Sequence, residues 1–243
     1  ASDQSHRCEL SGQRQQARMT LARFPRAALF DLDGTLLDSA PDMLATANRL
    51  RAAHGMPPMT LAQIRPQVSK GSRAMLAMAF PQLDVIERDA LVPLFLDTYQ
   101  QEIGKHSVLF EHVDAMLSAL EADGVTWGIV TNKPEYLARD ILPQLGWETR
   151  CAVLIGGDTL AERKPHPLPL QVAAGRIGVP AGDCVYVGDD ERDIQAARAA
   201  GMPSIAALWG YRQDHESPVE WGADVLLDSP AELLDPANWP SSL

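Results

Sequence analysis

Two acidic residues separated by one position follow the first apolar run of the chain. Residues 30–39 read FDLDGTLLDS, so the run Ala27–Phe30 leads directly into Asp31 and Asp33. In an extended strand, residues two apart face the same side, roughly 6–7 Å apart at about 3.3 Å per residue. Two carboxylates at that spacing can bracket a phosphorus or carbonyl centre. The alternative is that they cap a turn, because Asp before Gly is common in turns.

Three later segments place polar side chains directly after apolar runs. The segment IVTNKP offers a hydroxyl and main-chain donors, ERKPHP contains a lysine in a stiff loop, and VGDDERDI is rich in acids; the residues are Thr131, Asn132, Lys164, Asp189, Asp190, Glu191 and Asp193. Each has an ordinary structural alternative: a threonine at a strand end, a solvated surface lysine, and an acidic helix start with Asp190 as N-cap and Asp193 at N3.

The elements that must position these residues alternate between short apolar runs and helical patterns. We expect strands at 27–32, 127–132, 151–157, 184–189, 204–209 and 223–228, because each run is apolar and most end at Gly, Asp or Asn. The intervening helical patterns, such as ERDIQAARAAG ending at Gly201, predict a parallel, doubly wound α/β sheet of the Rossmann-like kind.

A long interval interrupts this alternation. From Pro41 to Ser107 the patterns are helical only, which predicts an all-helical cap at 41–107 inserted into an α/β core made of 26–40 and 108–243. An insert after the first strand would lie over the carboxyl edge of the sheet, where such folds bind ligands. Residues 1–25 are polar and Arg-rich and are expected to be a disordered leader, with Met19 as a possible natural start.

The four polar segments converge if each follows a different strand of one parallel sheet. Clustered carboxylates repel one another at neutral pH unless a hard cation neutralises them. Mg²⁺ prefers a few carboxylates, waters and a substrate phosphate. The sequence therefore predicts a Mg²⁺ site with a lysine and a hydroxyl around a phosphoryl group.

Composition excludes several classes of partner. The formal net charge of −11 disfavours nucleic acid, and no apolar run approaches the roughly 18–20 residues that cross a bilayer. Cys8, Cys151 and Cys184 lie far apart, which argues against a disulfide framework or a zinc site and favours the cytoplasm. Whether the chain is a monomer or a dimer is left open.

The motif D-x-D-G-T, a strand-ending Thr, a downstream Lys and the acids of G-D-D-x-x-D, in this order, resemble the haloacid dehalogenase superfamily. The resemblance covers residues 26 to about 235. A helical insert between the first two motifs is similar to the phosphatase branch that includes phosphoglycolate phosphatase. A receiver domain also has acids, Thr and Lys at strand ends, but it lacks this insert and orders those residues differently.

The resemblance implies a role for each matching residue. Asp31 would attack phosphorus and form an aspartyl-phosphate, while Asp33 would protonate the leaving alkoxide and then activate water. Asp31, Asp189 and a main-chain oxygen of Asp33 would hold Mg²⁺. Asp193 would act through water and Asp190 would orient its neighbours. Thr131, Asn132 and Lys164 would hold the phosphoryl oxygens, and Lys164 would also restrain Asp31.

The implied substrate is a small phosphomonoester, with 2-phosphoglycolate as the first candidate. Lys70 and Arg73 in the insert could bind its second anionic end, or Arg73 could be a solvated residue of its helix. The segments WGIVTNKP and VGDDERDI and the C-terminal part also resemble N-acetylmuramic acid 6-phosphate phosphatases. A sugar-phosphate mutase and a phosphate-sensing binder without catalysis remain as alternatives. His166 could reach substrate or lie exposed in its loop.

Overall fold

The fold is built on a parallel sheet, as predicted. The structure is a computed structural model that describes residues 24–240, so the predicted leader lies outside the described residues except for its last two positions. The strands are β1 (Ala27–Phe30), β4 (Thr126–Val130), β5 (Leu154–Ile155), β6 (Cys184–Gly188), β7 (Ser204–Ala207) and β8 (Val225–Leu227). They pair in the order β5-β4-β1-β6-β7-β8 with every pair parallel, and β1 lies inside the sheet.

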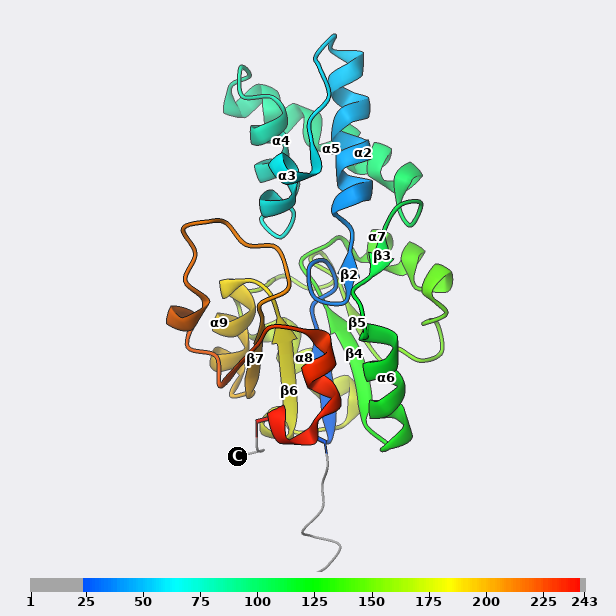
Figure 1. Cartoon of the computed structure of the whole chain (residues 1–243), viewed down its shortest axis with the longest axis vertical. Helices are drawn as coiled ribbons and strands as arrows, with labels where there is room; N and C mark the ends of the chain where they lie inside the picture. Colours follow the sequence, from blue (N-terminus) through cyan, green and yellow to red (C-terminus); the bar gives the residue numbers. More distant parts are fainter. Residues whose placement is uncertain (1–23, 241–243) are drawn as a thin grey trace, which may run out of the picture.

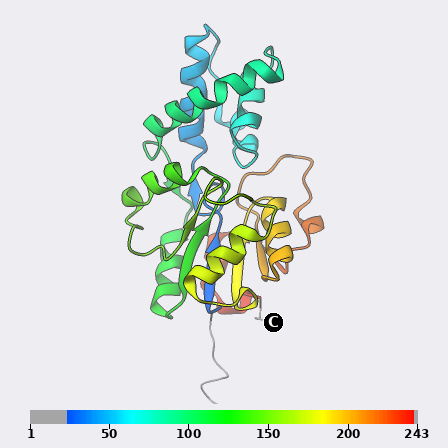
Figure 2. The ribbon, with the colours of Figure 1, turned by 180° about the vertical axis from the view of Figure 1, so that it is seen from behind.

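Both faces of the sheet are buried, which explains why its strands are apolar without alternation. In β1, Ala28 and Phe30 belong to one core cluster and Ala27 and Leu29 to another. The first face is covered by α6 (Val113–Ala122), α7 (Glu135–Ile141) and η5 (Pro230–Leu234). The second face is covered by α8 (Leu168–Ile177) and α9 (Glu191–Ala200) (Figures 1 and 2).

The interval predicted to lack strands contains helices joined by short connections, and its residues form no strand. The helices are α2 (Ala40–Ala53), α3 (Leu61–Ile64), η1 (Arg65–Gln67), α4 (Ser72–Ala79) and α5 (Val85–Glu102). They lie beyond the carboxyl edge of the sheet (Figure 1). We call this unit the cap; the division into a cap and a core domain stays a prediction. No helix within residues 24–240 is long and apolar enough to cross a membrane.

The sequence did not reveal a short antiparallel ladder at the base of the cap. Strand β2 (Leu37–Asp38) pairs with β3 (Val108–Leu109), with Leu37 opposite Leu109. The ladder joins the segment that enters the cap to the segment that leaves it. The remaining short helices are η2 (Pro143–Leu145), η3 (Ala181–Asp183), η4 (Pro218–Trp221) and η6 (Pro236–Asn238).

A buried carboxylate fixes the same base from the helical side. Asp42, in the first turn of α2, accepts hydrogen bonds of 2.7 Å from the backbone N–H groups of Gly104 and His106. The hydroxyl of Ser107 donates to it as well. Asp42 is fully buried, so water could not take its place as the acceptor for these donors if the carboxylate were removed.

We therefore expect Asp42→Ala to lower the free energy of unfolding by about 2–4 kcal/mol, since it leaves several buried donors unsatisfied. Asp97→Ala, an exposed acid on α5, serves as the matched control and should change it by less than about 0.5 kcal/mol. Urea unfolding followed by circular dichroism measures both. Equal effects in the two variants would contradict the role assigned to Asp42.

Candidate active site

Asp31 and Asp33 lie in a tight loop directly after β1, which ends at Phe30. The expected continuous strand is therefore wrong beyond that point. The carbonyl of Leu32 accepts N–H groups from Leu36 and Leu37 at 3.0 and 2.9 Å, which winds the chain into a turn. The N–H of Leu32 donates to Asp31 Oδ1 at 2.7 Å and fixes that carboxylate.

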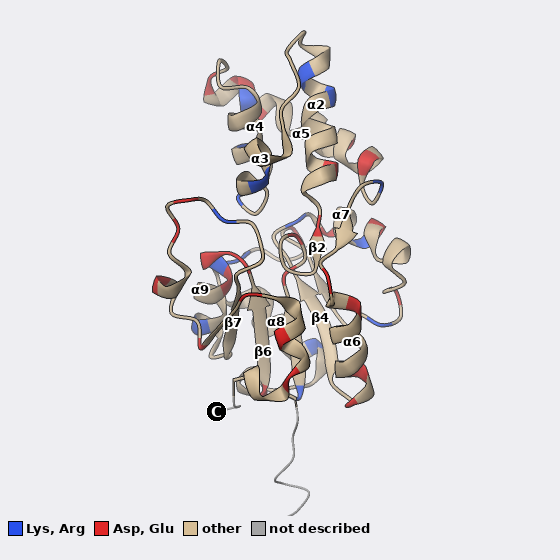
Figure 3. Cartoon of the chain, viewed as in Figure 1, with Lys and Arg blue, Asp and Glu red and all other residues tan. Residues whose placement is uncertain are grey.

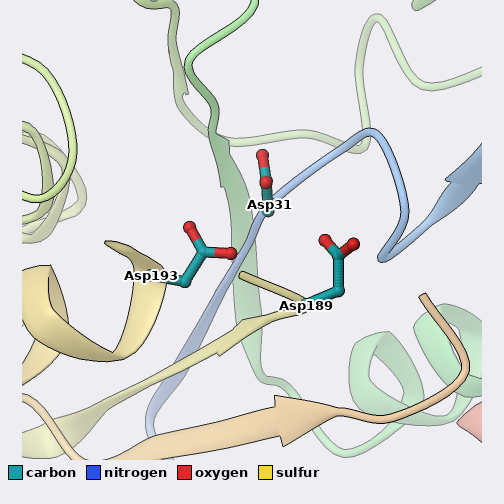
Figure 4. Close-up of side chains that lie close together, drawn as sticks. All are labelled: Asp31, Asp189 and Asp193. Atoms are coloured by element: carbon teal, nitrogen blue, oxygen red, sulfur yellow. The ribbon is translucent and has the colours of Figure 1, made fainter. Parts of the chain in front are cut away.

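Three carboxylates meet at the carboxyl edge of the sheet. Asp31 follows β1, Asp189 follows β6 and Asp193 lies in the first turn of α9, and one oxygen of each lies within 4.8 Å of the others. Figure 4 shows the three side chains close together. All three residues are buried. The expected meeting of Asp31 and Asp189 is found, and Asp193 joins them directly.

Asp189 is held by neutral donors. Thr35 Oγ1 donates to Oδ1 at 3.0 Å, while Ser69 Oγ and the N–H of Tyr211 donate to Oδ2 at 3.0 and 2.9 Å. Gly34 is required beside it: its φ is +87°, and a Cβ there would lie 2.1 Å from Asp189 Oδ2. None of these donors carries charge, so they orient Asp189 without neutralising it.

Burial makes this cluster electrostatically costly. Burial and the charges of Asp31 and Asp193 raise the pKa of Asp189 well above its usual range. Burial raises the pKa of Asp193 to about 7, although Lys164 opposes the shift. A divalent cation between the three oxygens would remove the repulsion, and oxygen donors of this kind suit a hard cation. The residues present therefore fit such an ion.

Lys164 is the buried cation of the cluster. Its Nζ lies 3.1 Å from Asp31 Oδ1 and 2.7 Å from Asp193 Oδ1. Burial opposes its charge, but Asp193 and Asp31 raise its pKa, so the lysine stays protonated. Asn132 Nδ2 donates to the Lys164 carbonyl at 2.9 Å and anchors the loop. The predicted restraint of Asp31 by Lys164 agrees with this geometry.

Lys133 was missed as a site residue. Its Nζ lies 3.0 and 3.1 Å from the two Asp33 oxygens and 2.6 Å from the hydroxyl of Tyr99 on α5 of the cap. Its backbone N–H donates to Thr131 Oγ1 at 3.2 Å, which joins the lysine to the end of β4. The signal in the sequence is its position in IVTNKP, next to Thr131 and Asn132.

The acids at the start of α9 have two functions at once. Asp190 is the N-cap of α9 and Asp193 completes a capping box, so the helix-start alternative is correct in geometry. Asp190 also accepts from Arg192 Nε at 2.7 Å. Burial alone would raise the pKa of Asp190, but hydrogen bonds and charge from Arg192, with a hydrogen bond from Lys70, lower it to about 2.

The cap candidates are engaged by protein carboxylates. Lys70 Nζ lies 2.7 Å from Asp190 Oδ2 and also contacts Glu216. Arg73 is largely exposed and pairs with Asp89 at 2.8 Å. His166 is exposed, as one alternative expected, and its Nδ1 accepts from the N–H of Leu168 at 3.2 Å.

A cavity of about 330 Å³ opens between these residues and the cap. Its core side carries the polar groups predicted from sequence, namely Asp31, Asp33, Thr131, Asn132, Lys164, Asp190 and Asp193. Its cap side is mostly apolar and includes Met43, Met75, Val92, Phe95 and Leu96. Lys70 and Arg73 line the same cavity. The site is thus a polar floor under an apolar wall.

The fold and the site together are those of a capped hydrolase. A parallel α/β sheet carries a carboxylate cluster and a buried lysine at its carboxyl edge, and a helical cap lies over them. The model of the haloacid dehalogenase-like hydrolase family matches residues 28–207, and the chain belongs to that family. The predicted superfamily and its phosphatase chemistry are confirmed.

Three relatives illustrate the similarity. A phosphoglycolate phosphatase of Xanthomonas campestris pv. campestris is 69% identical over 90% of this chain and 99% of its own. An N-acetylmuramic acid 6-phosphate phosphatase of Pseudomonas aeruginosa is 43% identical over 86% of this chain and 93% of its own. The crystal structure of a predicted phosphoglycolate phosphatase from Haemophilus somnus superposes with a TM-score of 0.77 at 28% identity, covering 88% and 98% of the two chains.

The carboxylate cluster predicts a divalent-cation response that needs no substrate. Millimolar Mg²⁺ should raise the melting temperature of the wild-type protein, because the ion binds the folded cluster and removes its repulsion. Asp189→Asn should lose most of that increase. Asp183→Asn, at the opposite end of β6, should keep it. A full Mg²⁺ response in Asp189→Asn would contradict the assignment.

Proposed function

We propose that the chain is a Mg²⁺-dependent phosphatase that hydrolyses a small phosphomonoester through an aspartyl-phosphate on Asp31. The observation that carries this proposal is the pairing of Lys164 with Asp31 and Asp193 beside Asp189. It combines an oriented nucleophile, a buried cation for phosphoryl oxygens and a carboxylate set for a metal ion. We also propose a cytoplasmic location, in keeping with the few, separated cysteines.

In the first step, one oxygen of Asp31 attacks phosphorus and the bond from phosphorus to the leaving oxygen breaks. Asp33 gives its proton to that oxygen, so a neutral alcohol departs. In the second step, Asp33 takes a proton from water, and the water oxygen displaces Asp31 from phosphorus. Inorganic phosphate leaves, and both aspartates return to their starting forms.

The other residues position these groups. Lys164, Thr131 and Asn132 would hold the phosphoryl oxygens, while Lys133, which follows β4 and contacts Tyr99 of the cap, keeps the Asp33 carboxylate in place. Asp31, Asp189 and Asp193 would hold Mg²⁺, with a further oxygen from the Asp33 main chain. The ion supplies charge neutralisation at the phosphoryl group.

The first candidate substrate is 2-phosphoglycolate. The support for it is the name of the relatives that share 69% and 64% identity with this chain over 90% of its length. A small ester that is anionic at both ends also explains why cations gather on the polar floor of an acidic protein.

Phosphate release with Mg²⁺ from 2-phosphoglycolate tests this proposal. We expect release in the wild type and its loss by about three orders of magnitude or more in Asp31→Asn, because the nucleophile is removed. Chelation should have the same effect, and added Mg²⁺ should reverse it. Phosphate transfer without net release would indicate a mutase instead. Phosphate binding without turnover would indicate a binder.

The cap wall favours a second candidate, N-acetylmuramic acid 6-phosphate. Five apolar side chains, Met43, Met75, Val92, Phe95 and Leu96, face a cavity of about 330 Å³, within the ~300–1,000 Å³ of drug-sized pockets. The N-acetyl and lactyl substituents each carry a methyl group that could contact this apolar wall. A glycolate group has no methyl group and could not make these contacts. The relatives at 43% identity carry that name.

A matched pair of variants on α5 separates the two candidates. Leu96→Ser alters the cavity wall, whereas Leu94→Ser makes the same change at a position that is 50% exposed on the same helix. If the larger alcohol contacts the wall, Leu96→Ser should lower its kcat/KM by about five- to tenfold, the worth of one or two buried methylene groups. The value for 2-phosphoglycolate should stay within about twofold. Equal losses for both substrates would contradict contact with the larger alcohol.

A further inference from the structure

The segment Gln67–Lys70 is where the cap touches the carboxylate cluster. Ser69 Oγ donates to Asp189 Oδ2 at 3.0 Å, and Lys70 Nζ donates to Asp190 Oδ2 at 2.7 Å. The guanidinium of Arg192 donates to the carbonyl of Ser69. These contacts are polar, so water competes for each of them whenever the segment moves away.

A loop of the core also contacts the segment Gln67–Lys70, on the side away from the substrate cavity. Residues 210–216 follow β7, and in Figure 3 this loop, with its acidic stretches, runs beside the basic lower end of the cap below α3. Gln213 Nε2 donates to Gln67 Oε1 at 3.0 Å, and Lys70 Nζ donates to Glu216. Glu216 lines a separate cavity of about 430 Å³, between this loop and the residues Ala62, Arg65 and Pro66 of the cap.

Two hydrogen bonds to the Gln213 backbone orient Glu216 toward Lys70. Its Oε2 accepts from the N–H of Gln213 at 2.8 Å, and its own N–H donates to the Gln213 carbonyl at 3.0 Å. The other oxygen, Oε1, meets Lys70. The side chains of the three ionic partners are only 23%, 4% and 13% exposed for Lys70, Asp190 and Glu216. The pairing is therefore better shielded than an ordinary surface ion pair.

We propose that Glu216 is a positioning residue of the phosphatase. It acts through Lys70: the ammonium joins Glu216 to Asp190, and this holds Ser69 on Asp189 with the cap closed over the cavity. Glu216 touches neither the carboxylate cluster nor the cavity in which substrate would bind. Its loss should therefore weaken closure, while Asp189 keeps its donors Thr35 and Tyr211 and the reacting groups stay in place.

Glu216→Gln tests this, because a neutral amide holds an ammonium more weakly than a carboxylate does. We expect KM to rise about tenfold with kcat within about twofold, since closure contributes to substrate binding and the chemistry is unchanged. Glu220→Gln is the matched control: the same change at an exposed position in η4, which should leave both constants within about twofold.

The Lys70→Gln background separates positioning from a merely structural role. If Glu216 acts through Lys70, Glu216→Gln should have little further effect once Lys70 is neutral, within about twofold. Full additivity would overturn the proposal, because it would mean that Glu216 acts by another route. An effect of Glu216→Gln no larger than that of Glu220→Gln would overturn it as well.

The kinetic readout rests on the proposed function, so a second readout is independent of it. Hydrogen exchange of the amides in residues 65–71 should quicken by about tenfold in Glu216→Gln, since this segment loses one of its anchors. The change should be absent in Glu220→Gln. If exchange responds as expected and no phosphomonoester is hydrolysed, the proposed function fails and the positioning contact stands. If hydrolysis is found but exchange and KM do not respond, the inference alone fails.

Discussion

The cost of burying several carboxylates together shapes the rest of this molecule. Asp31, Asp189 and Asp193 place oxygens within 4.8 Å of one another inside the protein. In a low-dielectric interior, such charges persist only if they are paired, protonated or bound to a cation. Lys164 pairs with two of the three, and the third receives hydrogen bonds alone. Asp189 therefore lacks a positive charge beside it, and a divalent cation bound between the three oxygens would supply one.

Because the carboxylates are packed closely inside the protein, glycines lie beside them. Gly34 has a positive φ, and a side chain there would collide with Asp189. A Cβ on Gly188 would collide with Asp193. The cap adds its own polar contacts, with Ser69 on Asp189 and Tyr99 on Lys133. Closure of the cap and order among the carboxylates are thus parts of one hydrogen-bond network, in which each member supports its neighbours.

The sequence predicted the parallel sheet and the residues at its carboxyl edge, because apolar runs and strand-ending polar residues are local signals. It overestimated the strand at 151–157, of which only Leu154–Ile155 is a strand, and it missed the β2–β3 ladder, whose strands are two residues long. It also missed Lys133 and Glu216 as partners of Asp33 and Lys70, because these contacts join residues 100 and 146 positions apart. Local pattern carries no information on such pairs.

The β2–β3 ladder has a consequence for how this fold changes over evolutionary time. Leu37 lies opposite Leu109 and Asp38 opposite Val108, so the cap enters and leaves through neighbouring backbones about 5 Å apart. The two ends of the insert therefore lie side by side, and the sheet can accommodate inserts of different length and sequence between them. A different helical unit joined at these two positions would present a new wall to the leaving group, provided that it supplied a donor to Asp189 in place of Ser69 and a partner to Lys133 in place of Tyr99. The exchange of one cap for another would thus need to match the fold at a single pair of strands and at these two side-chain contacts.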